Sequence, residues 1–386
     1  MKKLLLGAAS AVALLAAGSA FAAGNASTID QIGYAENASV DQSGSPSDAV
    51  AQITQGVTAA DEYNSANVTQ GGGAGNQASI TQNQVGYAAV SDPSNVSNSD
   101  QQGTDGTITV VQEGNNSSSI SQLQFSSYEH ALVGQSDNYN SAGIQQGGTQ
   151  ELAVVNQEEG TGNSASIVQS GTGDNVYAPS LLTATPPPPG PNNLQWYENV
   201  PTDSVLPGTP AGDTVYGPVG AVVDQNGSNN IGNINQAGFQ NFADVAQGGQ
   251  DGSANNVGSI SQGASLYQSD GVMYQDGHNN IAAINQSGAG TTYSTVWQNG
   301  NSNQAYSTQV GSEHSVIGQG VTGDDGAYPN TVTSDFASVD QTSGGDNSLV
   351  TQLGDNDAAY VAQTSTANAT STILQNGNYD VASVHQ

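Results

Sequence analysis

The sequence contains no cysteine and almost no basic residues. Because cysteine is absent from all 386 residues, the chain can form no disulfide and no thiolate ligand or nucleophile. Lysine and arginine together number two, against 33 aspartates and glutamates, and both are lysines near the start, Lys2 and Lys3. A chain without cationic side chains cannot neutralise phosphate groups, so nucleic-acid binding is excluded.

Long hydrophobic runs are also missing, apart from one at the beginning. Residues 1–22 combine two lysines, an apolar stretch at 4–17 and a small-x-small cleavage sequence at 20–22. The apolar stretch is too short to cross a bilayer, so these features predict a signal peptide and not a membrane anchor. We therefore expect a secreted mature chain that begins at Ala23 and does not span a membrane.

The residue sets that usually carry catalysis are missing as well. The chain has no Gly-x-Ser-x-Gly sequence, and a mature chain without lysine, arginine or cysteine lacks most partners that activate a nucleophile. The four histidines are scattered and have no ligand-like neighbours: His130, His278, His314 and His385. We expect no enzyme activity, no catalytic residue, no cofactor and no metal site. Loose Ca²⁺ binding by the acidic residues stays open, although the known calcium-loop signatures are missing.

What the sequence does contain is a nine-residue pattern, Asn-x-Ala-x-φ-x-Gln-x-Gly with φ aliphatic, along almost the whole chain. It is complete at 163–171 and 241–249, and near-copies begin at positions 37, 64, 76, 140, 230, 256 and 280. Most neighbouring glutamines of the pattern lie 11 to 13 residues apart. Self-similarity at a fixed short period is typical of one supersecondary unit stacked many times.

Within each unit the Asn, Ala, aliphatic and Gln positions alternate with small polar residues. Alternation is the period of a β-strand, so we expect these four side chains to point into a core and the residues between them to point outward. The predicted inward set is Asn37, Ala38, Val40, Gln42, Asn76, Ala78, Ile80, Gln82, Asn163, Ala165, Ile167, Gln169, Asn230, Ile234, Gln236, Asn241, Ala243, Val245, Gln247, Asn280, Ala282, Ile284 and Gln286.

A glycine two positions after the glutamine is typical of a tight turn, because glycine tolerates positive φ angles. The predicted turn glycines are Gly44, Gly171, Gly227, Gly238, Gly277, Gly288, Gly300, Gly354 and Gly377. Each unit is then one strand and one turn of about 11 residues, and two units form one rung. The prediction is an all-β fold, a β-solenoid or cross-β stack of roughly 28 units.

Proline divides this repeat into two arms. Ten of the thirteen prolines lie between residues 176 and 218, and proline is excluded from central strands because it lacks an N–H donor. We therefore divide the chain into a signal peptide at 1–22, repeat arms at 23–175 and 219–386, and a Pro-rich segment at 176–218. This segment is predicted to be a stiff linker or a loop extruded from the stack; a recognition segment built on Trp196 is the alternative.

Both repeat arms resemble the curlin repeat, Gln-x-Gly-x-x-Asn-x-Ala-x-x-x-Gln, and the second arm matches it most fully. Residues 225–236, 275–286 and 298–309 match this core, and residues 352–363 and 375–386 match it with Asp357 and Asp380 in place of Asn. The resemblance implies a secreted subunit of bacterial surface amyloid fibres, built of strand-turn-strand rungs. It also implies a nucleator subunit and an outer-membrane export system as partners.

The resulting expectation is a self-assembling extracellular protein that forms homopolymeric fibres for biofilm matrix or adhesion. The last unit, 380–386, shows no cap, so we expect its strand edge to act as a template. The alternative is a monomeric β-solenoid that binds a ligand, as adhesins or ice-binding modules do. Low hydropathy with high net charge is also typical of disorder, which we expect for the isolated monomer only.

Overall fold

The fold was analysed in a computed structural model of the chain. The structure describes residues 24–32, 36–45, 47–56, 64–83, 95–124, 126–158, 160–172, 220–239, 241–248, 254–263, 269–320, 332–342, 344–364 and 368–386. The predicted signal peptide and the Pro-rich segment lie outside these residues.

The described residues form two β-sheets, whose strands alternate along the chain. The first sheet has 14 strands: β1 (Ala26–Gln31), β3 (Val50–Gln55), β5 (Gln77–Asn83), β7 (Thr107–Glu113), β9 (His130–Gln135), β11 (Leu152–Glu158), β13 (Gly220–Asn226), β15 (Phe242–Gln247), β17 (Asp270–His278), β19 (Tyr293–Asn301), β21 (His314–Gln319), β24 (Asn347–Gln352), β26 (Thr370–Gln375) and the short β22 (Val332–Thr333), which pairs with β19. The second sheet has 13 strands: β2 (Asn37–Gly44), β4 (Ser65–Gly71), β6 (Val96–Gln101), β8 (Asn115–Gln122), β10 (Asn138–Gln146), β12 (Ser164–Thr172), β14 (Ile231–Phe239), β16 (Val257–Gln262), β18 (Ile281–Ser287), β20 (Gln304–Val310), β23 (Phe336–Gln341), β25 (Ala358–Gln363) and β27 (Val381–His385).

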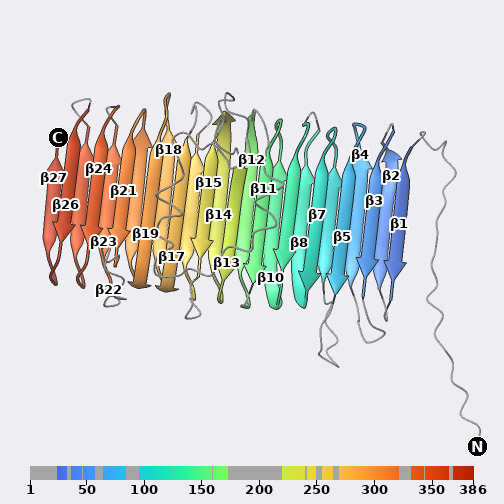
Figure 1. Cartoon of the computed structure of the whole chain (residues 1–386), viewed down its shortest axis with the longest axis horizontal. Helices are drawn as coiled ribbons and strands as arrows, with labels where there is room; N and C mark the ends of the chain where they lie inside the picture. The colour runs from blue at the N-terminus through green and yellow to red at the C-terminus, as the bar shows by residue number, and fades with distance from the viewer. Residues whose placement is uncertain are drawn as a thin grey trace, which may run out of the picture.

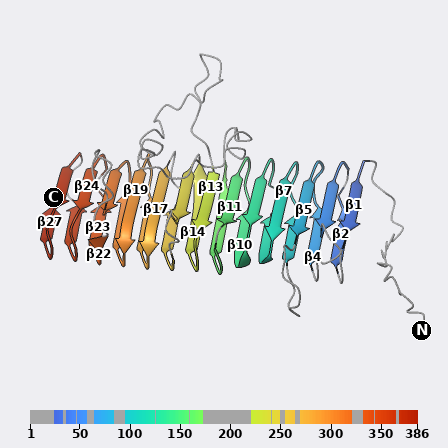
Figure 2. The ribbon, with the colours of Figure 1, turned by 60° about the horizontal axis from the view of Figure 1, so that its bottom comes forward.

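All strand pairs within the two sheets are parallel, and each strand pairs with the next strand of its own sheet along the chain. Figures 1 and 2 show the resulting row of rungs, with β1 and β27 at opposite ends. The predicted all-β solenoid of strand-turn units, two to a rung, is therefore confirmed. A single chain forms the whole stack, in contrast to the disorder expected of the isolated monomer. Among the residues described, no helix is long and apolar enough to cross a membrane.

The strand register places equivalent residues of successive rungs over one another. Ile53 pairs with Ile80, and Gln55 pairs with Gln82. Stacked glutamines are 21 to 33 residues apart in sequence outside the Pro-rich segment, and 67 or 68 apart across it. Strands β11 and β13 are direct neighbours, as are β12 and β14, so both repeat arms belong to one continuous stack.

The core between the sheets is thin because it consists of small and mid-sized side chains. Most strands contribute a small residue and then an aliphatic one, such as Ala282 and Ile284 in β18, both about 1% exposed. The intervening residues face outward, as the alternation of buried and exposed positions shows. Full burial of one Val or Ile contributes about 1.5–3 kcal/mol, so the stack gains stability in proportion to its length.

The predicted turn glycines have two different structural roles. Gly227, Gly238, Gly277, Gly288 and Gly300 have φ angles between 90° and 128°, as expected. The expectation is wrong for Gly44, Gly171, Gly354 and Gly377, which lie outside the left-handed region. These positions are crowded: a Cβ atom on Gly354 would collide with the carbonyl oxygen of Gly377 in the next rung. Glycine is needed at Gly171 and Gly354 because the backbone of the next turn leaves no room for a side chain.

Strands β6 and β20 depart from the aliphatic pattern. In β20 the buried Ser307 takes the aliphatic position, and its hydroxyl accepts a hydrogen bond from Ser294 at 2.9 Å. In β6 the inward residues are Ser97 and Ser99, and Ser99 lies in register between Val68 and Ile120. The Ser99 hydroxyl is buried and has no hydrogen-bond partner. A buried hydroxyl without a partner costs free energy, so β6 is a weak point of the first arm.

We expect Ser99→Val to raise the free energy of unfolding by about 1–2 kcal/mol, because it removes the unpaired hydroxyl and continues the Val68–Ile120 row. Urea unfolding of the two chains measures this difference. The matched control is Ser119→Val on β8, whose outward position is exposed and should change stability by less than about 0.5 kcal/mol. Equal effects of the two substitutions would show that the inward and outward faces are wrongly assigned.

Candidate functional site: amide ladders and the ends of the stack

The inward glutamines form one continuous hydrogen-bonded ladder in each sheet. In the first sheet each Nε2 donates to the Oε1 of the next rung at 2.7–3.0 Å, from Gln31 through to Gln375. In the second sheet the ladder runs from Gln42 to Gln386 at 2.7–3.2 Å. Both ladders therefore point in the same direction along the stack.

A second N–H, on most of the ladder glutamines, fixes this direction. The Nε2 of Gln286, for example, also donates to the carbonyl oxygen of Asp270 at 3.0 Å, in the opposite sheet. Gln247 does the same with Ile231, at 3.0 Å. Because Nε2 points toward that carbonyl oxygen, Oε1 points toward the preceding rung and accepts a hydrogen bond from its glutamine. The glutamines thus hold the two sheets together as well as the rungs.

A second ladder lies at the first position of the repeat. In the second sheet, from Asn95 onward, each Asn Oδ1 accepts the backbone N–H of the equivalent residue in the next rung, as Asn163 does from Asn230 and Asn280 from Asn303. The Oδ1 of Asn64 accepts instead from the side-chain nitrogen of Asn95, at 3.0 Å. The Asn side-chain nitrogen donates to turn carbonyls, which for Asn280 are those of Asp276 and Gly300, both at 2.9 Å. These asparagines therefore close the turn and connect it to the next one.

Most of the predicted inward set occupies these ladders and the core. Outside β2, all its members are buried, with at most 4% exposure. In β2, the side chains of Ala38, Val40 and Gln42 are half-buried because only one rung covers them. The prediction for Asn37 is wrong, since it is adjacent to inward Ala38 and is exposed. Glu36 takes the ladder position instead, and its Oε1 accepts from Asn64 at 3.2 Å.

Acidic residues replace the ladder asparagine in several rungs, and we did not predict most of them. Glu129, Glu151, Glu313, Asp335, Asp346 and Asp357 are each at most 2% exposed. The longer glutamates reach backbone N–H groups of neighbouring turns: Glu151 accepts from Gly171 at 2.6 Å and from Gly147 at 3.2 Å. Burial nevertheless raises the pKa of the Glu151 carboxyl to about 7.

A local sequence signal could have identified these positions. In several rungs the residue before the ladder position has a positive φ angle: 58° at Asn279, 61° at Asn356 and 64° at Tyr379. Of the six buried acids only Asp357 follows an Asn, so the signal that they share is spacing. Each lies six residues before a ladder glutamine, as Glu151 does before Gln157.

Outward acids also lie close together on the first sheet. Asp224 in β13 and Asp244 in β15 are neighbours, and Asp270 begins β17. Burial raises the pKa of Asp244 to about 7 and that of Asp224 to about 6, and a neighbouring acid adds to each effect. Burial alone raises the pKa of Asp270 to about 6. Within the described residues no group of three or more potential ligand side chains has a geometry that could hold a metal ion.

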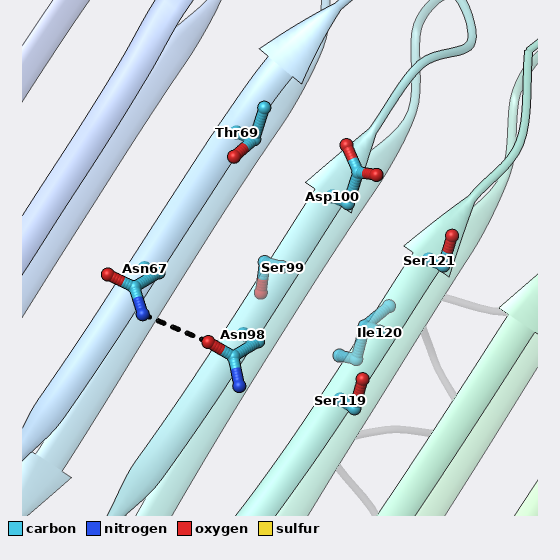
Figure 3. Close-up of a pocket in the computed structure, with 8 residues that line it drawn as sticks. All are labelled: Asn67, Thr69, Asn98, Ser99, Asp100, Ser119, Ile120 and Ser121. Carbon is cyan, nitrogen blue, oxygen red and sulfur yellow. Dashed lines mark hydrogen bonds between the residues drawn. The ribbon is translucent and has the colours of Figure 1, made fainter.

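The outer face of the second sheet has a shallow hollow of about 330 Å³ across β4, β6 and β8. Figure 3 shows its polar lining, in which the Asn67 side chain donates to Asn98 Oδ1 at 3.0 Å, with Asp100 and Ser121 nearby. Small outward side chains on β8 leave this space open. The hollow offers hydroxyl, amide and carboxylate groups but no convergent catalytic set.

The two ends of the stack are the least satisfied parts of the described chain. Strands β1 and β2 pair only with rungs that follow them, and β26 and β27 pair only with rungs that precede them. Val381 is 75% exposed and Leu374 is 67% exposed, and the inward Ala382 and Val384 are only half-buried. Gln375 and Gln386 each donate one N–H to a carbonyl and, within the described residues, have no following glutamine.

No protein-family model matches this sequence, and a comparison with curated proteins found no similar one.

We expect Gln236→Ala, Gln247→Ala and Gln286→Ala each to lower the free energy of unfolding by about 1–3 kcal/mol. Each loses hydrogen bonds to two neighbouring rungs and to one facing carbonyl in a buried site. Urea unfolding midpoints provide the measurement. The controls, Asn235→Ser, Ala246→Ser and Asn285→Ser, change outward residues of the same strands. The ladder account fails if the controls are as destabilising as the glutamine variants.

Proposed function

We propose that this protein is a secreted structural subunit that assembles head to tail into extracellular fibres, for a biofilm matrix or for surface adhesion. The observation that carries the proposal is the complementarity of the two ends of the stack. Its function is then mechanical, and its principal partner is a second copy of itself. A nucleator subunit and an outer-membrane export system, both implied by the curlin resemblance, are further partners in this proposal.

The second sheet illustrates the complementarity of the ends. The last strand has Ala382, Val384 and Gln386 at the inward positions, and β2 has Ala38, Val40 and Gln42 at the same spacing. If a second copy follows in the register that every internal rung keeps, Gln386 Nε2 meets Gln42 Oε1. The ladder then continues across the junction without a change of direction.

The first sheet ends in the same way. Ser371, Ile373 and Gln375 in β26 have the spacing of Ser27, Ile29 and Gln31 in β1. The added rung would supply partners for the exposed strand edges and cover the half-buried aliphatic residues at both ends. Unpaired parallel edges with matching inward residues favour end-to-end stacking.

A monomeric binding module is the second candidate, and the hollow on β4, β6 and β8 is the observation that favours it. Its lining offers hydrogen-bonding groups for a polar ligand. The outward residues of the three strands mix Asn, Thr, Asp and Ser, and do not form the regular Thr array expected of an ice-binding face.

We expect the purified chain that begins at Ala23 to form unbranched fibres visible by electron microscopy. Ser383→Pro should prevent their growth. Gln386, directly after β27, donates its backbone N–H to the Ala362 carbonyl and accepts the N–H of Thr364, each at 2.9 Å. By alternation the N–H of Ser383 therefore points away from β25. Proline at 383 therefore removes a donor that only an added copy would use.

The matched control for that experiment is Ser383→Ala, which keeps the backbone N–H and should assemble like the unsubstituted chain. The end-to-end proposal is wrong if Ser383→Pro elongates normally, or if the unsubstituted chain stays monomeric while retaining its β-structure. The second result would favour the binding module.

Charge should control the rate of assembly. The exposed outward residues Asp41 and Asp340, and the half-buried Asp224 and Asp244, face solvent in a chain with almost no cations. We expect faster assembly in 1 M salt, where the Debye length is about 3 Å. We also expect it to accelerate as pH falls from 8 towards 4, beginning near pH 6 to 7, because burial raises the pKa of Asp224 to about 6 and that of Asp244 to about 7, so these carboxyls gain protons first. Fibre formation followed by amyloid-dye fluorescence tests this; rates that are highest at neutral pH in low salt would contradict it.

A further inference from the structure

The asparagine ladder of the second sheet changes to aspartate in its last rungs. Asn occupies the ladder position in every described rung from Asn64 to Asn303, and Asp335, Asp357 and Asp380 follow. Asp335 and Asp357 are each 1% exposed. Asp and Asn have nearly the same shape, so this change alters hydrogen-bonding capacity without altering packing.

One carboxyl oxygen of each aspartate behaves like the amide oxygen that it replaces. Asp335 Oδ1 accepts the backbone N–H of Asp357 at 3.0 Å, and Asp357 Oδ1 accepts that of Asp380 at 2.9 Å. The equivalent bond from Asn303 to Asn280 Oδ1 is 3.0 Å. The ladder therefore continues geometrically through the acidic rungs.

The second oxygen has no such equivalent. The Oδ2 atoms of Asp335 and Asp357 are buried and have no hydrogen-bond partner. In asparagine rungs this position is a nitrogen that donates to turn carbonyls, those of Asp276 and Gly300 for Asn280. By register the equivalent carbonyls for Asp357 are those of Leu353 and Gly377.

The direction of Oδ2 supports this equivalence. A Cβ atom built on Gly354 would lie 2.8 Å from Asp357 Oδ2, so this oxygen points into the turn and not toward solvent. An ionised oxygen cannot donate, and it would face carbonyl dipoles of the same sign. A protonated carboxyl group has an O–H at this place and can reproduce the asparagine contact.

The surrounding charges also oppose ionisation. Asp335 is faced by Asp357 and by Asp355 from the turn before β25, and its partner on β20 is the neutral Asn303. Asp357 is faced by Asp355 and by Asp380 at the start of β27. The only lysines of the chain are Lys2 and Lys3, and there is no arginine. No described cation offsets a negative charge at this corner of the stack.

We propose that Asp335 and Asp357 form a proton-dependent latch that holds the last rungs, β23, β25 and β27, closed when the two carboxyl groups are protonated and loosens them when the groups ionise. The latch acts within one chain and does not depend on fibre formation. The fold would then be tightest at its C-terminal end under acidic conditions.

The pKa values agree in direction. Burial, reinforced by the nearby acids, raises the pKa of Asp335 to about 7, and burial also raises the pKa of Asp357. A carboxyl whose pKa is higher in the folded chain binds its proton more tightly there than in the unfolded chain. Its contribution to stability is therefore present at low pH and is lost as pH rises from the ordinary value of 3.8 towards about 7.

Amide hydrogen exchange of the unsubstituted full chain tests the latch, because it measures the protection of individual strands. After correction for the intrinsic pH dependence of exchange, we expect protection of the β25 and β27 amides to fall by about tenfold or more between pH 5 and pH 8, because each unit of pKa shift corresponds to a factor of ten. Protection in β5 and β7, whose rungs carry Asn76 and Gly106 at this position, should change much less. Glu151, Asp224 and Asp244 also have raised pKa values, which is why a local readout is needed.

The double variant Asp335→Asn, Asp357→Asn should retain at pH 8 the protection that the unsubstituted chain has at pH 5. The matched control is Asp340→Asn on β23, an exposed outward aspartate, which should leave the pH dependence unchanged. The latch is excluded if the double variant keeps the full pH dependence, or if Asp340→Asn removes it.

Should the double variant fail to fold, a second measurement decides the question in the unsubstituted chain. Carbon-13 labelling of aspartate and an NMR titration should show a carboxyl with a midpoint well above pH 5 that couples to the β23 and β25 backbone. Titration of both carboxyls at ordinary values would overturn the proposal. So would protection at pH 8 that rises with Ca²⁺ and falls with a chelator, since a bound cation would then take the place of the proton.

Discussion

The whole structure depends on one requirement, that every buried side-chain amide be satisfied by the rung after it and by the facing sheet. Gln286 illustrates the requirement, since its two N–H groups reach Gln309 Oε1 and the Asp270 carbonyl at 3.0 Å each. A buried amide that lost one of these partners would cost about 1–3 kcal/mol, comparable to the burial of a whole aliphatic side chain. The requirement can be met only when equivalent residues stack in parallel register and the sheets stay close. Small core residues and tight turns follow from it.

The same requirement gives the ends and the acidic rungs their properties. Inside the stack each ladder glutamine donates a hydrogen bond to the glutamine of the next rung. Within the described residues, Gln375 and Gln386 have no such glutamine to donate to. In an end-to-end contact, a second copy would supply the glutamines that accept from these two side chains. We therefore consider assembly to be the function best supported by the geometry. Where Asp335 and Asp357 replace asparagine, a proton is needed to preserve the donor, and the stack becomes sensitive to pH at that point.

The sequence was sufficient to predict the fold class and the facing of most strands, because alternation and a fixed repeat length are direct consequences of strand stacking. The prediction of inward residues was wrong where two motif residues are adjacent. Asn37 and Ala38 cannot face the same side of β2, and Glu36 takes the inward position. The repeat pattern did not reveal that Gly354 is needed for close stacking and not for its φ angle, since that depends on the neighbouring turn. The sequence also could not show that one carboxyl oxygen of Asp357 lacks a hydrogen-bond partner, because this depends on the register of successive rungs.

Electron cryomicroscopy of assembled filaments tests the central claim most directly. We predict strands perpendicular to the filament axis and a rise per chain on the order of 60 Å, because thirteen strands of the second sheet stack about 4.8 Å apart. At each junction β27 should lie against β2 of the following copy, with Gln386 over Gln42. Filaments joined through the outer faces of the sheets, or a junction in which the glutamine ladder is out of register, would contradict the account.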